Sequence, residues 1–164
     1  MTQNLRLSGG RTLTPADSNV ASSWDFPNTS LTEGNSYTDA RSAISSDTSY
    51  GGYYNYCAAS AGTNCQSSSA TNTTYDICPA GWRLPTDSEN YGIAGFYDSA
   101  FSPVYSGRYR NGSLDDTGSY GSWWSSTADG SSYQYYLYYY GGNLRATDYG
   151  NKYYGFSVRC VRSS

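Results

Sequence analysis

Alternating apolar and polar positions mark a short segment at the start of the chain and predict a short strand in its middle. Leu5 and Leu7 alternate with polar residues at the start, and Trp82 and Leu84 alternate with their neighbours before Pro85. The last apolar segment, GFSVRCVR at residues 155–162, is typical of a terminal strand. These segments are predicted to form the framework of the fold.

A helix is predicted at residues 87–99. Thr86 and Glu89 have the spacing of a capping box, in which each side chain accepts a hydrogen bond from the other residue's backbone N–H. Asp87 adds a negative charge in the first turn, where the helix dipole favours it. Two glycines within the segment weaken the helix but do not abolish it.

The run SYQYYLYYY at residues 132–140 alternates as a strand does. Strict alternation turns Tyr135, Leu137 and Tyr139 inward. It exposes the intervening tyrosines on the other face: Tyr136, Tyr138 and Tyr140. A shift of one residue would reverse both faces. The following segment, GGNLRATDYGNKYY, is predicted to be a loop.

Residues 28–75 are low in aliphatic side chains and rich in Ser, Thr, Asn, Gly and Ala. Such a segment has little apolar surface to offset the entropy of ordering the chain. We therefore predict long surface loops here.

Composition and charge narrow the classes of partner. The 164 residues fit a single domain, residues 1–164, and the net charge of −3 is unlike the basic surface that binds nucleic acid. No apolar run approaches the ~20 residues of a membrane span. The start, MTQNLRLSGG, lacks the charged and apolar regions of a signal peptide, so we expect any export signal or anchor to lie outside this sequence.

Four cysteines allow three disulfide pairings. The spacing of Cys57 and Cys65 suits a local loop closure, which leaves Cys78 to pair with Cys160. This even set suggests an oxidising compartment. A zinc site is disfavoured because the chain has no histidine and no C-x-x-C pair.

The absence of histidine also removes the imidazole base of the common nucleophilic pairs. Asp115 and Asp116 are adjacent carboxylates, but their glycine-flanked segment is more typical of a turn than of an acid and base facing one substrate. We therefore predict no catalytic residues, no bound metal in the site and no cofactor. A structural calcium ion held by loop oxygens remains compatible with the sequence.

Three separated motifs carry a family resemblance: CPAGWRLPT at residues 78–86, GSWWSSTA at residues 121–128, and GFSVRCVR at residues 155–162. In this order they resemble the Fibrobacter succinogenes major paralogous domain, of the formylglycine-generating-enzyme subclass of the C-type lectin-like fold. The opening TQNLRL is similar to that family's usual start. The resemblance implies an α+β fold with a small twisted antiparallel sheet, one or two helices and long loops.

The C-terminal third resembles the variable proteins of diversity-generating retroelements, in which adenine-directed mutagenesis rewrites one segment of a C-type lectin-like framework. Residues 129–154 consist largely of the residue types reachable in this way, and half of the chain's 20 tyrosines lie between Tyr120 and Tyr154. The resemblance implies a framework at residues 1–119 and a variable region at residues 120–162 that ends in the terminal framework strand.

Tyrosine with Ser, Gly, Asn and Asp is also the composition of antibody paratopes, since tyrosine offers a large, rigid and amphipathic contact surface. The predicted ligand-binding residues are Tyr133, Tyr136, Tyr138, Tyr140, Asn143, Arg145, Asp148, Tyr149, Asn151, Lys152, Tyr153 and Tyr154. We assign Trp124 to the core, and Arg159 and Arg162 to framework hydrogen bonds or ion pairs.

We therefore expect a non-enzymatic adhesion protein, extracellular or on a cell or phage surface, that binds a protein or glycan ligand on another cell or particle. One alternative is an enzyme like the formylglycine-generating enzymes, which use a reactive cysteine pair with copper. The other is a sugar-binding lectin with calcium, although WWSST stands where a calcium-binding segment would be expected.

Overall fold

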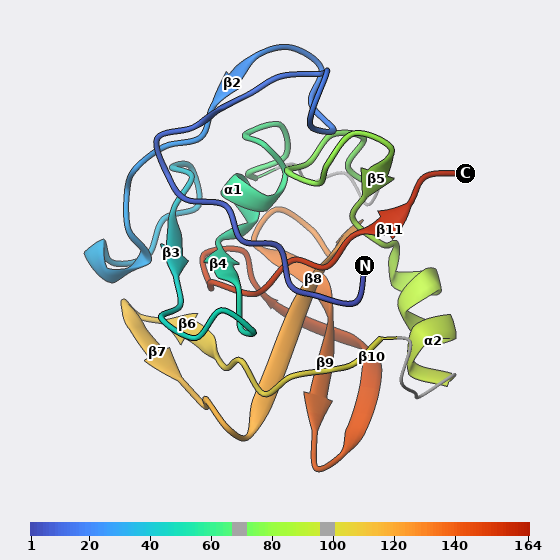
Figure 1. Ribbon diagram of the computed structural model, residues 1–164. Helices are drawn as coiled ribbons and strands as arrows, with labels where there is room; N and C mark the ends of the chain where they lie inside the picture. Colours follow the sequence, from blue (N-terminus) through green and yellow to red (C-terminus); the bar gives the residue numbers. More distant parts are fainter. Residues whose placement is uncertain (67–71, 96–100) are drawn as a thin grey trace.

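The computed structural model describes residues 1–66, 72–95 and 101–164 as a mixed α+β fold (Figure 1). Its central element is a three-stranded antiparallel sheet in the order β10-β9-β8. The strands are β8 (Tyr120–Ala128), β9 (Tyr133–Tyr140) and β10 (Asn143–Asn151). The predicted α+β class and small antiparallel sheet are confirmed.

The other described strands form short antiparallel pairs around this sheet. The pairs are β1 (Thr12–Leu13) with β2 (Trp24–Asp25), β3 (Ser42–Ile44) with β4 (Gly52–Tyr54), β5 (Trp82–Arg83) with β11 (Val161–Arg162), and β6 (Arg108–Arg110) with β7 (Ser113–Asp115). The described helices are η1 (Leu31–Glu33), α1 (Tyr56–Ala59) and α2 (Asp87–Gly95). Neither α1 nor α2 has the length and hydrophobicity needed to cross a membrane.

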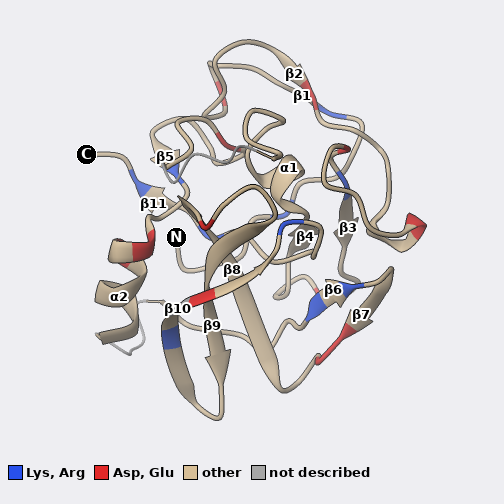
Figure 2. Cartoon of the chain, turned by 180° about the vertical axis from the view of Figure 1, so that it is seen from behind, with Lys and Arg blue, Asp and Glu red and all other residues tan. Residues whose placement is uncertain are grey.

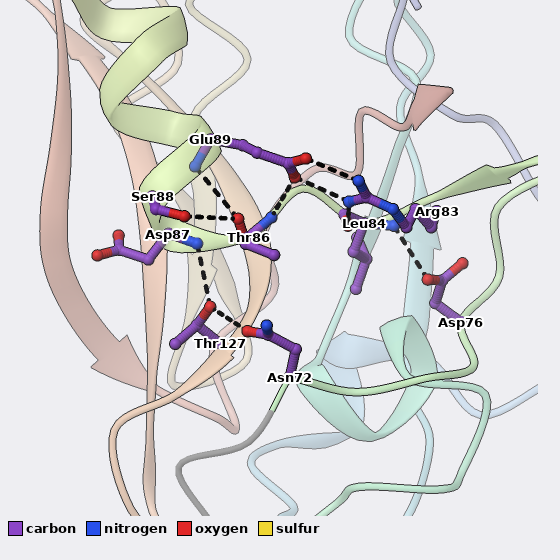
Figure 3. A network of polar contacts seen from close by, with 9 residues as sticks. All are labelled: Asn72, Asp76, Arg83, Leu84, Thr86, Asp87, Ser88, Glu89 and Thr127. Atoms are coloured by element: carbon purple, nitrogen blue, oxygen red, sulfur yellow. Dashed lines mark hydrogen bonds and ion pairs between the residues drawn. The ribbon is translucent and has the colours of Figure 1, made fainter. Parts of the chain in front are cut away.

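Helix α2 begins with the predicted capping box (Figure 3). The Thr86 N–H donates to Glu89 Oε2 at 2.8 Å, and the Glu89 N–H donates to Thr86 Oγ1 at 3.2 Å. The Arg83 guanidinium also donates to both carboxylate oxygens of Glu89, at 2.8 and 2.7 Å. The predicted helix start is confirmed, and the described helix ends at Gly95; the last four residues of the predicted helix lie outside the described ranges.

The two adjacent tryptophans of β8 enter two different cores. Trp124 packs against Tyr56 and Phe156 in the main core, while Trp123 packs with Leu137 in a second cluster beneath α2. Both tryptophans are at most 1% exposed. Because neighbouring side chains of a strand point to opposite faces, the middle of β8 is covered on both sides. The core assignment of Trp124 is confirmed.

The prediction that residues 28–75 are surface loops is wrong for residues 51–61. This segment contains β4 and α1, and every one of its residues is buried. Tyr53, Tyr54 and Tyr56 supply most of the buried apolar surface, and Ala58 and Ala59 are fully buried as well. A scarcity of aliphatic side chains therefore did not mean exposure, because aromatic rings and alanines fill the core here.

The predicted loop at GGNLRATDYGNKYY is also corrected. Residues 143–151 form β10, which pairs with β9 from Asn143 opposite Tyr140 to Asn151 opposite Tyr133. The hairpin turn consists of Gly141 and Gly142, with φ values of 57° and 77°. Two central residues with positive φ are what a tight two-residue hairpin needs, and glycine adopts them without strain.

The predicted terminal strand is shorter than residues 155–162. Only Val161 and Arg162 form β11, while Phe156 and Ser157 make isolated bridges to Tyr54 and Trp123. The segment runs beside the N-terminal residues, as Figure 1 shows, with the Leu5 N–H donating to the Val158 carbonyl oxygen.

Arg159 is a framework residue, as predicted. Its guanidinium donates to Asn4 Oδ1 and to the carbonyl oxygens of Phe101 and Ser102. Burial lowers the pKa of Arg159 to about 10. These oxygens solvate the buried charge and join the two ends of the chain.

Candidate functional site

Two disulfides fix the framework beneath the sheet. Cys57 pairs with Cys65, and Cys78 pairs with Cys160, so the predicted pairing is confirmed and all four cysteines of the chain are joined. The second bond links the segment before β5 to the segment before β11. Disulfides of this kind indicate an extracellular or otherwise oxidising environment.

Tyrosine rings from β8 and β9 form an aromatic surface on one face of the sheet. Tyr120 stacks on Tyr140, with ring centroids 4.5 Å apart and planes inclined by 14°. The Tyr138 ring centroid lies 6.3 Å from that of Tyr120, and the guanidinium of Arg108 lies over the Tyr120 ring, 4.8 Å from its centroid. Tyr140 is 49% exposed, whereas Tyr120 and Tyr138 are half-buried.

The row of rings continues toward the C-terminal segment and the N-terminal loops. Tyr138 contacts Tyr136 at 5.9 Å, and Phe156 then bridges Tyr136 and Tyr154 at 4.6 and 6.0 Å. Tyr154 contacts Tyr153 at 5.1 Å.

The row ends at Tyr37, which lies in the loop after η1 and contacts the Tyr153 ring at 5.0 Å. The Tyr37 hydroxyl donates to Asn151 Oδ1 at 3.2 Å. We call the tyrosines of this row the tyrosine face: Tyr37, Tyr120, Tyr136, Tyr138, Tyr140, Tyr153 and Tyr154.

Tyr136 belongs to the row but is not an exposed contact residue, which corrects its predicted exposure. It is only 6% exposed, because Trp124, opposite it on β8, and Phe156 both lie on the same side of the sheet. Its hydroxyl donates to Asp148 Oδ2 at 3.1 Å, and burial raises the pKa of the phenol. Tyr136 therefore forms the floor of the tyrosine face.

Lys152 is likewise not available to a ligand in this structure. The residue is 1% exposed, and its ammonium lies over the Tyr56 ring at 5.4 Å from the centroid. Burial lowers the pKa of Lys152 to about 8. The backbone explains the burial, because Lys152 immediately follows β10 and its carbonyl oxygen accepts a hydrogen bond from the Tyr56 N–H.

The opposite face of the sheet is covered by α2. Leu137 is buried there, and Tyr139 is half-buried and stacks on Tyr105 at 4.5 Å. Tyr135 is half-buried and donates to Asp129 Oδ1. The predicted inward orientation is confirmed for Leu137, while Tyr135 and Tyr139 are only partly covered.

Tyr133 and Tyr149 are exposed, at 42% and 55%, and their rings contact each other at 5.6 Å. The register places Tyr149 opposite Tyr135, so this pair lies on the α2 side of the sheet. The predicted binding residues therefore divide between two faces rather than forming one surface.

Polar residues of β10 border the tyrosine face. Asn143 and Arg145 are exposed and lie opposite Tyr140 and Tyr138, respectively. Arg145 has no ion-pair partner within the described ranges. Figure 2 shows that β8 and β9 carry no charged side chain, and the charged residues of β10 are Arg145 and Asp148. The face is thus aromatic and almost neutral, with the opposite charges of Arg145 and Asp148 on its β10 side.

The β6–β7 hairpin forms the opposite border of the face. Arg108 pairs with Asp116 at 3.0 Å, and Arg110 pairs with Asp115 at 3.2 Å. Asp116 has a φ of 62° and its carbonyl oxygen accepts a hydrogen bond from the Ser119 N–H, as expected in a turn, whereas Asp115 is the last residue of β7; the turn prediction is therefore confirmed for Asp116 only. Their side chains neutralise and orient the two arginines.

Sequence reasoning missed Tyr37, Arg108 and Tyr120 as members of this site. Tyr120 stands at the start of the segment that composition singled out, so the concentration of tyrosines was a usable signal for it. Tyr37 and Arg108 lie far away in the sequence, and only the fold brings them to the face. In the described parts of the chain, no three His, Cys, Asp or Glu side chains cluster as a metal site would require.

Comparison with family models, with curated proteins and with solved structures yields no significant match for this chain.

Proposed function

We propose that this protein is a ligand-binding adhesion protein with a C-type lectin-like fold, and that the tyrosine face is the binding surface of a diversity-generating retroelement variable protein. The observation that carries the proposal is the row of ring contacts from Tyr140 to Tyr37, in which buried Tyr136 and Phe156 join the partly exposed tyrosines at its two ends. Rings that contact one another lose little freedom on binding, so such a surface is preorganised for a ligand.

The distribution of residue types supports diversification. In β9 and β10 the aliphatic residues Leu137 and Leu144 are buried under α2, while Tyr140, Asn143 and Arg145 are exposed. Exposed positions built from Tyr, Asn and Arg tolerate substitution, because few core contacts depend on them. A constant scaffold with a replaceable surface is what repeated rewriting of one segment requires.

The three motifs that carry the family resemblance pack together, which supports the proposed framework. The first and third motifs are joined by the β5–β11 pair and by the Cys78–Cys160 disulfide. The second and third are joined where the Trp124 N–H donates to the Ser157 carbonyl oxygen at 3.2 Å. With all four cysteines paired, no thiolate is left for the enzyme alternative.

The expected ligand is a protein or glycan on another cell or particle, and we place the protein on a cell or phage surface. A nearly neutral aromatic surface supports this choice, because tyrosines contact both apolar side chains and sugar rings while their hydroxyls form hydrogen bonds.

The test is to sequence the DNA around the gene and search for a near-copy of the segment encoding residues 120–162, with a reverse transcriptase gene nearby. We expect differences at adenines of the copy, in codons for exposed residues such as Tyr140, Asn143 and Arg145. Codons for Leu137 and Phe156 should be identical in the two copies. Absence of any copy, or differences spread equally over buried codons, would overturn the diversification proposal.

A further inference from the structure

A second candidate site lies away from the sheet, between β2 and the Cys57–Cys65 disulfide. It is a cavity of about 400 Å³ lined by Trp24, Thr29, Thr38, Asp39 and both of these cysteines, among others. This volume falls within the range of small-molecule sites in proteins. None of these residues belongs to the tyrosine face.

The Trp24 ring forms an aromatic wall held by its surroundings. Phe26 contacts its ring edge-on at 5.7 Å, and Gly62 lies against the indole nitrogen. A Cβ at position 62 would stand 3.0 Å from Trp24 Nε1, and Gly62 has a φ of 73°. Both the close approach and the backbone conformation therefore require glycine, which lets the indole lie against the backbone. Trp24 is only half-buried, so part of the residue remains exposed.

Several polar side chains that line the cavity have no hydrogen-bond partner among the residues that the structure describes. Within the described ranges, neither the Trp24 indole N–H nor the hydroxyls of Thr29 and Thr38 has a hydrogen bond to another residue. The Asp39 side chain is 68% exposed, and its carboxylate forms an ion pair with Arg41, 3.8 Å from Nη2. Residues that carry one indole donor, two hydroxyls and one carboxylate thus line the same cavity.

We propose that this cavity binds a neutral hexopyranose residue. A pyranose ring presents C–H groups that pack on an aromatic ring, and its hydroxyls donate to a carboxylate and accept from an indole N–H. The carboxylate favours a neutral sugar over an acidic one, since a second negative charge would be repelled. Thr38 and Asp39 directly follow Tyr37, so the sugar would lie near the end of the tyrosine face. The proposal does not depend on diversification of that face.

The test is titration of the full chain with methyl α-D-mannopyranoside, methyl β-D-galactopyranoside and N-acetylglucosamine, followed by the indole N–H resonances of the tryptophans in NMR spectra. We expect at least one pyranoside to shift the Trp24 resonance, assigned with Trp24→Phe, in a saturable manner with a Kd of about 1 mM. The resonances of buried Trp123 and Trp124 should not move.

Asp39→Ala should weaken this binding about tenfold, because it removes a charged hydrogen-bond acceptor. Glu33→Ala removes another exposed acid, outside the cavity, and should leave the affinity unchanged. Sorbitol carries hydroxyls but no ring, and it should not shift Trp24. The proposal is overturned if no pyranoside shifts the Trp24 resonance, if sorbitol shifts it equally, or if Asp39→Ala binds like the unmodified chain.

Discussion

Tyr120 and Tyr140 stack face to face across β8 and β9, with ring planes inclined by only 14°. The stack holds the most exposed ring of the row, that of Tyr140, at the hairpin end of the sheet. Tyr136, at the other end of the same strand face, is enclosed by Trp124 and Phe156. One face of β9 therefore changes from core to surface within four residues.

This change predicts unequal effects of tyrosine truncation on stability. Tyr136→Ala should lower the free energy of unfolding by about 3–5 kcal/mol, since it leaves a cavity beside Trp124 and Phe156. Tyr140→Ala should cost about 1 kcal/mol, chiefly the stacking on Tyr120. Urea denaturation of the two variants measures both values. Equal costs would contradict the assignment of Tyr136 to the floor of the face.

The two disulfides should contribute differently to stability. Cys78 and Cys160 are 82 positions apart in the sequence, whereas Cys57 and Cys65 are 8 apart. In the chain-entropy model the longer loop stabilises by about 2 kcal/mol more. Replacing Cys78 and Cys160 together by Ser should therefore lower the midpoint of denaturation further than replacing Cys57 and Cys65. The opposite ranking would show that the α1 loop depends on its closure more than chain entropy implies.

The Arg83–Glu89 pair predicts a stability change in acid. The hydrogen bonds from Arg83 are the main cause that lowers the pKa of Glu89 to about 2. Because the unfolded chain binds this proton more tightly, the stabilisation is present above about pH 4.3 and is lost as the pH falls toward 2. We expect about 1 kcal/mol, since the pair is partly exposed to solvent.

Glu89→Gln isolates this charge, because glutamine retains the capping-box geometry. The stability difference between the unmodified chain and Glu89→Gln should shrink as the pH is lowered from 5 to 2 in denaturation experiments. Glu33→Gln, which removes an exposed acid in η1, controls for the loss of one negative charge. A difference that stays constant with pH would contradict the assigned role of Arg83.

Buried Lys152 predicts a change of the opposite kind in base. Desolvation lowers its pKa in the folded protein to about 8, below the value of about 10.4 in an unfolded chain. Between these values the unfolded chain binds more protons, so stability should rise with pH, by about 1 kcal/mol per unit. Well below pH 8, Lys152 is charged in both the folded and the unfolded chain, and the destabilisation by its buried charge is then at its maximum.

Comparison with Lys152→Met between pH 7 and 9.5 tests this behaviour, since methionine fills similar space without a charge. The unmodified chain should gain stability relative to this variant as the pH rises through 8 and 9. The measurement stops below pH 10, where tyrosines of the unfolded chain begin to ionise. Parallel pH profiles would show that Lys152 does not titrate as a buried group.

The amino-acid sequence by itself determined the features that depend on neighbouring residues. The start of α2 follows from Thr86 and Glu89, because a capping box is a local hydrogen-bond pattern. The pairing of Cys57 with Cys65 follows from their short separation. The alternation of β9 likewise separated Leu137 from Tyr138 and Tyr140, because successive side chains of a strand point to opposite faces.

Only the tertiary structure decided which faces are covered. Alternation distinguishes two faces of β9 but cannot reveal that Phe156 covers Tyr136 on one of them while α2 covers Leu137 on the other. Burial of Lys152, and the arrival of Tyr37 and Arg108 beside the sheet, depend on contacts between residues distant in the sequence. Such contacts form because separate segments pack into one core. The pattern of residues within a single segment does not determine which other segments it will contact.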